Sequence, residues 1–599
     1  MGDAHLILCG GLRSGRRARG GAEPLRLAIG RGSGDVHLRL NQFSGAMRAG
    51  LTPLGADLIE LCSYVYVADQ TVTRGGVKSF DYADRWRRKL HFRVPVRCPD
   101  IWNRLAVRDA VRDLLQFLTD DEYEFEFLPA DSSTGLERFL LDEVPPEEGA
   151  EFEEVVLFSG GLDSLCGAVD EVLAGQRRVL LFSHRPENRV FARQRSLCNA
   201  IRSRLPNPKA TPYHFAATVN KGKKLNRDFT QRSRSFLFAS MAAVVARLFG
   251  LRRIRFYENG VTSLNLPISP QMIGGRTSRT THPQTLRRFA RLFSLLFDTD
   301  FAVENPYQWS TKPEILQRLA ILRHSDLCAA TSSCVHTWTR TEQYPHCGLC
   351  SQCVDRRISV LAAGLSESDD PNRRYECDVI TGERTGLDLA FVERYVGSAF
   401  DTNRLGTARE FAARYPEIAH LVPYTGLQSD ETVRKTFDLY RRHAVEVSRV
   451  VQAAIAARSE TVMHQTYPSC SLLGAVVGRA SRNRPAIPDA ASAGGSTAAR
   501  VALGFIVDSN TFEVKLGAGR CFLGNTNEFH LLARLLKARG HYLSVQTLRT
   551  EVWNDENTEK NTIQKTVSNL RRKLHNAEIK QVTIDGSQRD HYRLIGPRE

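Results

Sequence analysis

One short stretch, Val155–Ser164, constrains the fold of this chain more than any other. It opens with apolar residues, which predict a strand buried on both faces, as strands of a parallel sheet are. A polar loop follows, Ser159-Gly160-Gly161-Leu162-Asp163-Ser164, and apolar residues at helical spacing continue to Leu173. Glycines let backbone N–H groups approach an oxygen closely, and a helix start adds partial positive charge. The stretch therefore predicts an anion-binding loop between a strand and a helix.

The loop lacks the Gly-Lys-Ser/Thr string of a Walker-type phosphate loop. It resembles instead the PP-loop of ATP pyrophosphatases, which split ATP between the α- and β-phosphates and hold the pyrophosphate. The resemblance implies that the six loop residues bind ATP and pyrophosphate: Ser159, Gly160, Gly161, Leu162, Asp163 and Ser164. The two serines would add hydroxyl donors. Asp163 would orient the loop or hold Mg²⁺, and the alternative is that it caps the helix.

Strands and helices alternate from Val155 to about Ser366. We expect further strands at Val179–Ser183 and Arg253–Tyr257, and helices at Arg193–Arg204 and Phe236–Phe249. Such alternation predicts a parallel sheet with helices on both faces and a ligand site at the carboxyl ends of its strands. Three loops are expected there: Ser159–Ser164, His184–Pro186 and Glu258–Gly260.

The length of 599 residues predicts several domains, and the fold class is multidomain α/β. We expect an N-terminal α+β domain (1–150), the strand-and-helix domain (151–366), a helical region (367–480), a linker (481–500) and a C-terminal domain (501–599). The pattern assigns no chemistry to the first or third of these. The N-terminal elements expected are strands His5–Cys9, Leu25–Ile29, Val36–Leu40 and Leu90–Val96, and helices Asp57–Asp69 and Val107–Leu118, with a glycine-rich turn at Gly30–Gly34.

Four of the 13 cysteines, Cys334, Cys347, Cys350 and Cys353, have C-x12-C-x2-C-x2-C spacing. Thiolates at this spacing can converge on one ion, so the group predicts a structural zinc site. An iron–sulfur cluster is the alternative, since its ligands are also thiolates. His336 or His346 could replace one ligand. The remaining cysteines are scattered, which is typical of reduced thiols and favours a cytoplasmic location.

From about residue 152 to 365 the chain resembles the QueC family, the 7-cyano-7-deazaguanine synthases. The resemblance rests on the order of the loop, the segments Arg232–Phe238, Asn305-Pro306 and Ser310–Ile315, and the cysteine group. Ser235 stands where the family has Asn, and the first cysteine spacing is longer than usual. The family's Tyr-Pro-Asp-Cys-Arg segment is replaced by Asn265–Pro267 and Arg279–Pro283. In these departures the chain is similar to QueC-like proteins of anti-phage defence operons (Qat, type IV CBASS), which also carry an extra N-terminal domain.

The resemblance implies an ATP-dependent C–N ligase that requires ATP, Mg²⁺ and Zn²⁺. ATP would adenylate a carboxylate, and ammonia or an amine would displace AMP to give an amide, which a second round could dehydrate to a nitrile. Asp163 and Lys312 would be catalytic, and Arg232 and Arg234 would neutralise phosphate charge. The acceptor would be a carboxylated 7-deazaguanine-like molecule. The alternatives are conjugation of such a group to a protein partner, and a DNA-binding regulator whose PP-loop domain senses nucleotide.

The last hundred residues predict three helices and a hairpin, the order of a winged helix. The helices are expected at Thr526–Ala538, Ser544–Trp553 and Thr562–His575, and the strands at Gln581–Ile584 and His591–Leu594. The domain resembles the DNA-binding domain of OmpR/PhoB-type response regulators in Asn527–Leu532, Leu548-x3-Val552-Trp553 and Leu570–Leu574. The third helix has an apolar stripe, Ile563, Val567, Leu570 and Leu574, which should be buried.

The opposite face of the third helix carries the residues predicted to bind duplex DNA: Asn561, Lys565, Ser568, Asn569 and Arg572. Arg589 or Arg593 on the hairpin would reach a minor groove or phosphates, and a protein-binding winged helix is the alternative. The excess of 82 Lys and Arg over 66 Asp and Glu fits a polyanionic partner. No run approaches the about 18 apolar residues of a membrane span, so no membrane association is expected.

Overall fold

The computed structural model describes residues 4–12, 23–30, 35–40, 51–73, 87–130, 151–185, 187–222, 225, 231–267, 279–336, 340–481, 499–500, 506–508, 513–516, 519–523, 526–538, 541–553, 559–579, 581–588 and 590–596. They fall into two compact units, which are described separately. The first unit comprises residues 1–333, 355–372 and 394–453, and the second comprises 334–354, 373–393 and 454–599. A basic run, Arg13–Arg19, and most of an acidic stretch expected as a linker, Glu143–Glu154, lie outside the described residues. So do residues 31–34 of the glycine-rich turn, Pro186, most of the linker 481–500 and Arg589.

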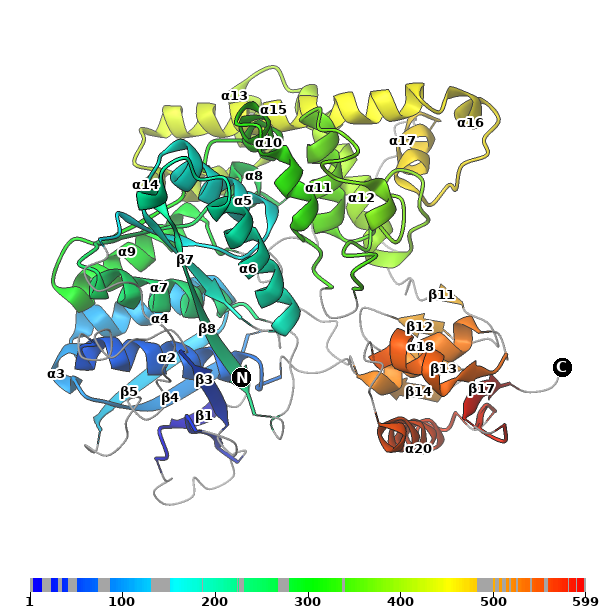
Figure 1. Cartoon of the computed structure of the whole chain (residues 1–599), viewed down its shortest axis with the longest axis horizontal. Helices are drawn as coiled ribbons and strands as arrows, with labels where there is room; N and C mark the ends of the chain where they lie inside the picture. The colour runs from blue at the N-terminus through cyan, green and yellow to red at the C-terminus, as the bar shows by residue number, and fades with distance from the viewer. Residues whose placement is uncertain are drawn as a thin grey trace. The chain divides into compact units, whose positions relative to one another are not determined.

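The first unit is built on a six-stranded sheet of order β10-β9-β6-β7-β8-β3 (Figure 1). Five strands are parallel: β6 (Glu154–Leu157), β7 (Val179–His184), β8 (Tyr213–Lys221), β9 (Arg253–Arg255) and β10 (Ala302–Glu304). The sixth, β3 (Val36–Arg39), pairs antiparallel with β8. The predicted parallel sheet is confirmed. Its strand order reverses beside β6, which makes the carboxyl ends of β6 and β9 the topological switch point.

Alternate residues of β6 and β7 face two different helix layers. Val156 and Leu181 pack against α5 (Leu162–Val169), α6 (Asn188–Arg202) and α10 (Lys312–Ile321). Val155 and Phe182 pack against α2 (Pro53–Asp69), α7 (Arg234–Leu248) and α9 (Pro283–Phe297). Helices therefore cover both faces, as the alternating sequence pattern predicts. A π-helical turn, Asp170–Ala174, extends α5.

The N-terminal region forms a second sheet, of order β2-β1-β4-β5, below α2 and α4 (Leu105–Thr119). Its strands are β1 (Ala4–Cys9), β2 (Leu25–Leu27), β4 (Lys89–Val96) and β5 (Glu122–Pro129), with α3 (Pro99–Trp102) after β4. All its pairs are parallel, so this region is α/β and the expected α+β arrangement is wrong. The segments expected as strands on either side of Gly30–Gly34 enter different sheets, because β2 pairs with β1 and β3 pairs with β8.

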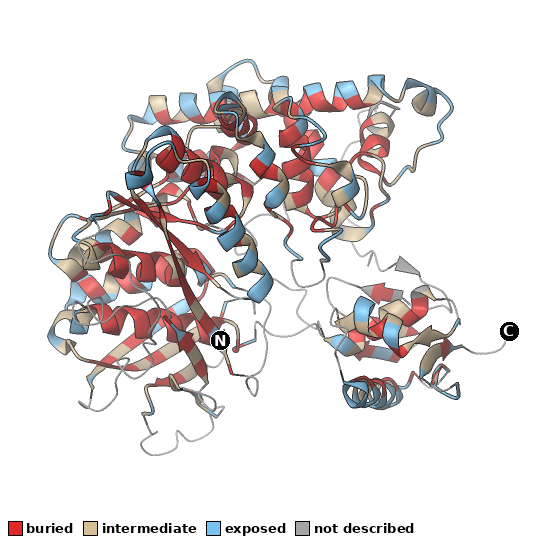
Figure 2. Cartoon of the chain, viewed as in Figure 1, coloured by how far each residue is buried: buried red, intermediate tan, exposed pale blue. Residues whose placement is uncertain are grey.

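Helix α2 lies between the two sheets, and every residue from Gly55 to Asp69 is buried (Figure 2). Thr52 caps its start by accepting a hydrogen bond from Gly55 N at 3.1 Å, and Pro53 takes its first position. Helix α7 is also buried nearly all round. One hydrophobic core thus joins residues 1–130 to the six-stranded sheet, and the domain boundary at 150 stays a prediction.

A buried ion group joins these layers. Arg88, which is 4% exposed, donates to Asp69 at 2.5 Å and to Asp121 at 2.6 Å. The other carboxylate oxygen of Asp69 accepts from the N–H and the hydroxyl of Ser233, each at 2.9 Å, at the start of α7. A charge removed from water is tolerated only when it is paired and hydrogen-bonded, as here. The N-terminal region therefore positions the beginning of α7.

The remaining helices before the C-terminal domain lie between residues 260 and 481 and are divided between the two units. Their bounds are α8 (Gly260–Leu264), α11 (Ser351–Ala362), α12 (Gly386–Asn403), α13 (Ala408–Arg414), α14 (Val422–Thr425), α15 (Ser429–Ala456), α16 (Ser459–Met463) and α17 (Leu472–Ser481). Within the first unit, Phe411, Phe437 and Tyr440 of α13 and α15 pack on Leu264 and Leu266 around α8. Because α8 follows β9 directly, this packing puts α13 and α15 at the carboxyl end of the six-stranded sheet within the first unit.

The C-terminal domain begins with a four-stranded antiparallel sheet: β11 (Ala499–Arg500), β12 (Ile506–Asp508), β13 (Glu513–Leu516) and β14 (Gly519–Phe522). The sequence pattern missed this sheet. Three helical segments and a hairpin follow: α18 (Asn527–Lys537), α19 (Val545–Leu548) with a π-helical turn Arg549–Trp553, α20 (Lys560–Asn576), β16 (Thr583–Asp585) and β17 (His591–Ile595). β15 (Leu543–Ser544) pairs with β17. This is the predicted order of a winged helix.

The Arg88→Ala variant should lose roughly 3–5 kcal/mol of unfolding free energy, because Asp69 and Asp121 remain buried without their cation. Arg87→Ala is the matched control, since the exposed Arg87 pairs with Asp120 at 3.1 Å at the surface. Loss of that pair should cost less than about 1 kcal/mol. Urea unfolding followed by circular dichroism measures both. Equal losses of unfolding free energy in the two variants would show that the buried ion group of Arg88, Asp69 and Asp121 does not stabilise the packing of the N-terminal region on α7.

Candidate functional sites

The loop after β6 closes on itself through short polar contacts. Ser159 Oγ accepts from Gly161 N at 3.2 Å and lies 3.0 Å from Ser164 Oγ. Ser164 Oγ lies 3.1 Å from the carbonyl oxygen of Gly161, to which it can donate. Helix α5 begins directly after Gly161, so its free N–H groups lie in this loop. The structure therefore brings the six predicted residues into one turn at the switch point.

The two glycines differ in what they require. Gly160 has φ of +79°, a left-handed conformation that favours glycine, and an added Cβ would lie 3.1 Å from Gln194 Cγ. Gly161 has φ of −80°, which any residue adopts, and its nearest neighbour would be Ser159 Oγ at 3.3 Å. Gly160 is therefore the position where the backbone itself demands glycine.

Two buried side chains beside the loop have polar atoms without a hydrogen-bond partner among the described residues. Gln194 is 1% exposed and donates to the carbonyl oxygens of Ser159 at 3.2 Å and His184 at 3.3 Å, but its Oε1 accepts nothing. His184 Nδ1 is also without a partner. Burial and the nearby charge of Arg234 lower the pKa of His184 to about 3, so this ring is neutral. Buried polar atoms are normally satisfied, which favours a polar ligand or water here.

Asp163 bridges to the neighbouring strand instead of capping α5. Its Oδ2 accepts from the backbone N–H of Asn259 at 3.0 Å and from the Asn259 amide at 2.8 Å. Asn259 Oδ1 in turn accepts from Thr262 N at 3.1 Å and caps α8. The carboxyl ends of β6 and β9 are thus tied together through one carboxylate.

Lys312 is 6% exposed and lies between two carboxylates. Its Nζ is 2.5 Å from Asp355 Oδ2 and 3.6 Å from Asp163 Oδ1. Burial disfavours the ammonium, but Asp163 and then Asp355 more than compensate, so the pKa of Lys312 is raised. Burial also acts to raise the pKa of the Asp355 carboxyl. The positive charge of Lys312 outweighs burial, so the pKa of Asp355 is lowered. Thr311 and Glu314 form a capping box that fixes the start of α10.

Several groups around Lys312 were not identified from the sequence. Asp355 lies on α11, and Tyr395 of α12 donates to its Oδ1 at 3.2 Å. Thr311 donates to Glu446 of α15 at 2.7 Å, and burial raises the pKa of Glu446 to about 7. The helical region, to which the sequence assigned no chemistry, therefore supplies polar groups to this site.

Glu258 is a second carboxyl that the sequence placed only within a strand-end loop. Thr281 donates to its Oε2 at 2.5 Å, and Asn305 donates to its backbone oxygen at 2.7 Å. Burial, the largest effect, and the charge of Asp163 raise the pKa of Glu258, while the hydrogen bond from Thr281 lowers it. The net result is a pKa of about 7. Thr281 belongs to Arg279–Pro283, the segment that departs from the QueC pattern. Glu258 can therefore exchange a proton near neutral pH.

The two predicted arginines, Arg232 and Arg234, flank Ser233 at the start of α7. Arg234 is exposed and acts electrostatically on His184 at the end of β7, the strand next to the loop-bearing β6. Arg232 is half-buried. Arg234 therefore lies near the carboxyl end of β7, and the phosphate-binding role of both arginines stays a prediction.

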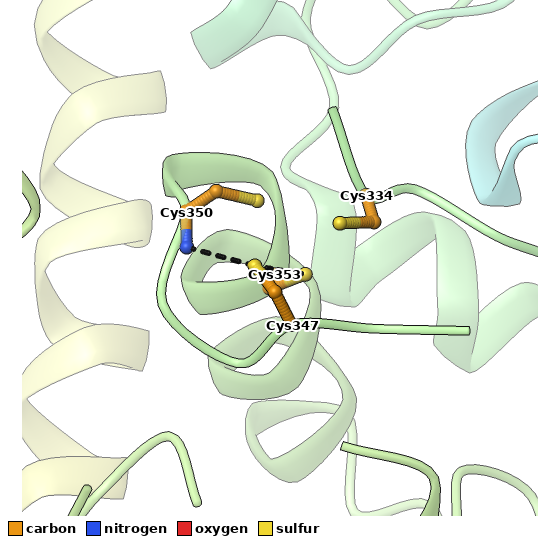
Figure 3. A group of neighbouring side chains, drawn as sticks. All are labelled: Cys334, Cys347, Cys350 and Cys353. Atoms are coloured by element: carbon orange, nitrogen blue, oxygen red, sulfur yellow. Dashed lines mark hydrogen bonds between the residues drawn. The ribbon is translucent and has the colours of Figure 1, made fainter. Parts of the chain in front are cut away.

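The four predicted cysteines converge in the second unit (Figure 3). Their sulfur atoms are buried and lie within 4.8 Å of one another, with Cys347 Sγ 3.8 Å from Cys353 Sγ. The N–H groups of Leu349 and Cys350 donate to Cys347 Sγ at 3.4 and 3.3 Å. The neighbouring sulfurs, Cys334 first, lower the pKa of the Cys347 thiol. The backbone donors favour the thiolate form of Cys347, which is the form that binds metal.

The cysteine geometry fits a single ion. A tetrahedral zinc with metal–sulfur distances of about 2.3 Å separates its sulfurs by about 3.8 Å. An iron–sulfur cluster places several atoms between its ligands and needs wider spacing than 4.8 Å allows. Gly348, between two of the ligands, has φ of +77°, and a Cβ there would lie 1.7 Å from Cys377 O. These four side chains could therefore hold a metal ion such as zinc.

No other group of three or more Cys, His, Asp or Glu ligand atoms converges within the part of the chain that the structure describes. His336 and His346 are not in the group. Asp163 alone does not make a metal site. Mg²⁺ commonly binds one or two carboxylates together with substrate phosphates, and Asp163 fits only that mode.

In the winged helix, α20 has the two predicted faces. Ile563, Val567, Leu570 and Leu574 are buried, as the apolar stripe predicts. Asn561, Lys565, Ser568 and Arg572 are exposed, and Asn569 is half-buried and accepts from Arg572 at 3.1 Å. In Figure 2 this exposed face of α20 is pale blue. Arg593 is engaged elsewhere, since it bonds to Asp585 at 3.0 Å and lies over the Tyr542 ring.

Residues 519–594 match the family described as transcriptional regulatory protein, C terminal. No curated protein matches the chain. The match and the fold together identify the C-terminal domain as a winged helix of this regulator type. Among the described helices, none has the length and apolar character needed to cross a membrane.

Elemental analysis of purified protein should find one zinc per chain. Cys350→Ser should lose the metal and unfold at a lower temperature. Its unfolding free energy should fall by several kcal/mol, because a structural metal contributes folding energy. Cys377→Ser is the matched control, since this cysteine lies next to the group but its sulfur is not one of the four. Iron and sulfide in anaerobically purified protein, or equal effects of the two variants, would rule out the zinc assignment.

Proposed function

We propose that the first unit is a QueC-like enzyme that uses ATP to activate a carboxylate, with release of AMP and pyrophosphate. One observation carries the proposal: the glycine loop lies at the switch point of a parallel sheet, beside a buried Lys312 held by Asp163 and Asp355. Ligands of open parallel sheets bind at this place. The unsatisfied polar atoms of Gln194 and His184 add support.

In the proposed reaction, a carboxylate oxygen attacks the α-phosphorus of ATP, and the bond to the pyrophosphate oxygen breaks. The N–H groups around Gly160 and Gly161 would bind the leaving pyrophosphate, and Lys312 would offset its charge. An amine then attacks the acyl carbon and AMP leaves. The nitrogen must lose a proton in this step. We propose Glu258 as the acceptor, because it follows β9 directly before Asn259, which donates to Asp163 at 3.0 Å, and burial raises the pKa of its carboxyl to about 7.

The substrate we propose is a carboxylated 7-deazaguanine-type base, converted to an amide or nitrile as part of anti-phage defence. This rests on the QueC resemblance of residues 152–365. Transfer of such a group to a protein partner is the alternative. The cysteine group would hold Zn²⁺ as a structural ion, and Mg²⁺ would enter with ATP.

Purified protein with ATP, Mg²⁺, ammonium and 7-carboxy-7-deazaguanine should yield AMP and pyrophosphate, measured by chromatography. Gly160→Ala should lower this turnover at least tenfold, because the Cβ crowds Gln194 and strains the loop. Gly250→Ala is the matched control: its φ is also left-handed, at +72°, and nothing lies within 4 Å of the added Cβ.

ADP and phosphate as products would contradict the PP-loop assignment. Saturable ATP binding without turnover, for this carboxylate and for a protein acceptor, would favour a regulator that senses nucleotide. Equal losses in Gly160→Ala and Gly250→Ala would show that general strain, and not the loop, causes the effect.

The second proposed function is duplex DNA binding by the winged helix. The family match at residues 519–594 and the exposed polar face of α20 favour it. Lys565 and Arg572 would contact phosphate or base edges, while Asn561, Ser568 and Asn569 would contribute to sequence preference.

Arg572→Ala in the full chain should weaken binding to mixed duplexes. If Arg572 contacts phosphate, the slope of the logarithm of the binding constant against the logarithm of salt concentration should become shallower by about one. Arg520→Ala is the control, because Arg520 is an exposed arginine of the same domain on β14. Fluorescence anisotropy at several salt concentrations measures both. No saturable binding, or binding unchanged by Lys565→Glu with Arg572→Glu, would make the domain a protein-docking module.

A further inference from the structure

A cavity of about 690 Å³ lies along the outer edge of the six-stranded sheet. Its walls are β10, the exposed side of α9, and Tyr424 and Thr425 of α14. The volume is within the usual range of ligand pockets, about 300–1,000 Å³. Neither the loop after β6 nor Lys312 lines it. The groove adjoins the proposed ATP site through Asn305, which donates to the backbone oxygen of Glu258.

The floor of this groove is an edge strand. Among the described strands β10 pairs only with β9, where Ala302 N donates to Arg252 O and Phe256 N donates to Glu304 O. In a parallel ladder alternate residues face opposite sides, so the N–H and C=O of Val303 face the groove. Edge strands with free backbone groups accept an added strand from another chain.

The groove is cationic. Arg252, Arg287 and Arg291 line it, all three are exposed, and none forms an ion pair or side-chain hydrogen bond among the described residues. Two carboxylates line the groove. Arg255 pairs with Glu304 at 3.0 Å, so Asp300 is the carboxylate that remains to offset the three arginines. Three arginines against one free carboxylate favour an anionic occupant.

The spacing of the arginines matches an extended chain. Arg287 and Arg291 are four residues apart on α9 and share one face, so they lie about 6 Å apart along the helix. In a strand, side chains on one face repeat every two residues, or about 6.6 Å. Acidic residues at alternate positions of a strand on β10 would therefore meet both arginines.

We propose that this groove binds an extended acidic segment of a partner protein, added as a strand to β10. Val303 forms the backbone hydrogen bonds, and the arginines of α9 bind acidic side chains at every second position. The backbone bonds provide the register, and the charges provide the preference for acidic sequences. This binding needs neither ATP nor DNA.

A labelled peptide, Thr-Asp-Val-Asp-Val-Asp-Thr, tests the proposal by fluorescence anisotropy with the full chain and no ATP. It should bind saturably, and Arg287→Glu with Arg291→Glu should raise Kd at least tenfold. The matched control is Arg108→Glu with Arg112→Glu, another exposed arginine pair four residues apart, on α4. That control should leave Kd within twofold. Hydrogen exchange of residues 301–305 should slow when the peptide binds.

A second peptide with proline in place of each valine keeps the charge but removes backbone donors, and it should bind at least tenfold more weakly. Equal binding of the two peptides would reduce the groove to a charged surface and overturn the added strand. Absence of binding, equal loss in the α4 control, or a single-stranded oligonucleotide that competes as well as the peptide would also overturn it.

Discussion

The ammonium of Lys312 is the charge around which the proposed site is arranged. A buried cation is stable only with close anions, and Asp163 and Asp355 provide them from α5 and α11. Asp163 also accepts from Asn259 at the end of β9. One charge thus ties together the loop after β6, the end of the neighbouring strand and the start of α10. Asp355, once buried, needs a hydrogen bond at its second oxygen as well, and Tyr395 of α12 donates it.

Local patterns predicted local structure well. The strand, loop and helix around Ser159–Ser164, the cysteine group and the two faces of α20 depend on residues close in the chain, and the structure has all three. Strand-end position predicted the loop that contains Glu258, but not its hydrogen bond from Thr281. Asp355 could not be predicted as a site residue, because the fold brings it to Lys312 from a distant position in the chain. The partner of a strand is equally non-local. For that reason β2 and β3 were expected around one turn but enter different sheets.

The N-terminal region supports the six-stranded sheet, and α2 packs against both sheets. A helix buried on every side has no solvent-facing stripe, so apolar residues occur all round α2. Its buried carboxylates Asp57 and Glu60 are paired with Arg97 at 2.9 and 2.7 Å. Asp69 ends this helix and fixes the start of α7 through Ser233. Arg232 and Arg234 flank that serine. The placement of both arginines therefore depends on residues from the first quarter of the chain.

The antiparallel strand β3 has a consequence for modularity. It comes from the N-terminal region, yet it covers the edge of β8. A gene fragment that encoded only residues 151–366 would uncover the edge of a nine-residue strand and expose apolar residues of α7 and α9 that share a core with the N-terminal region. Such a fragment would be prone to self-association. The loop-bearing sheet is therefore not an independent module, because its outer edge and part of its core come from the first quarter of the chain.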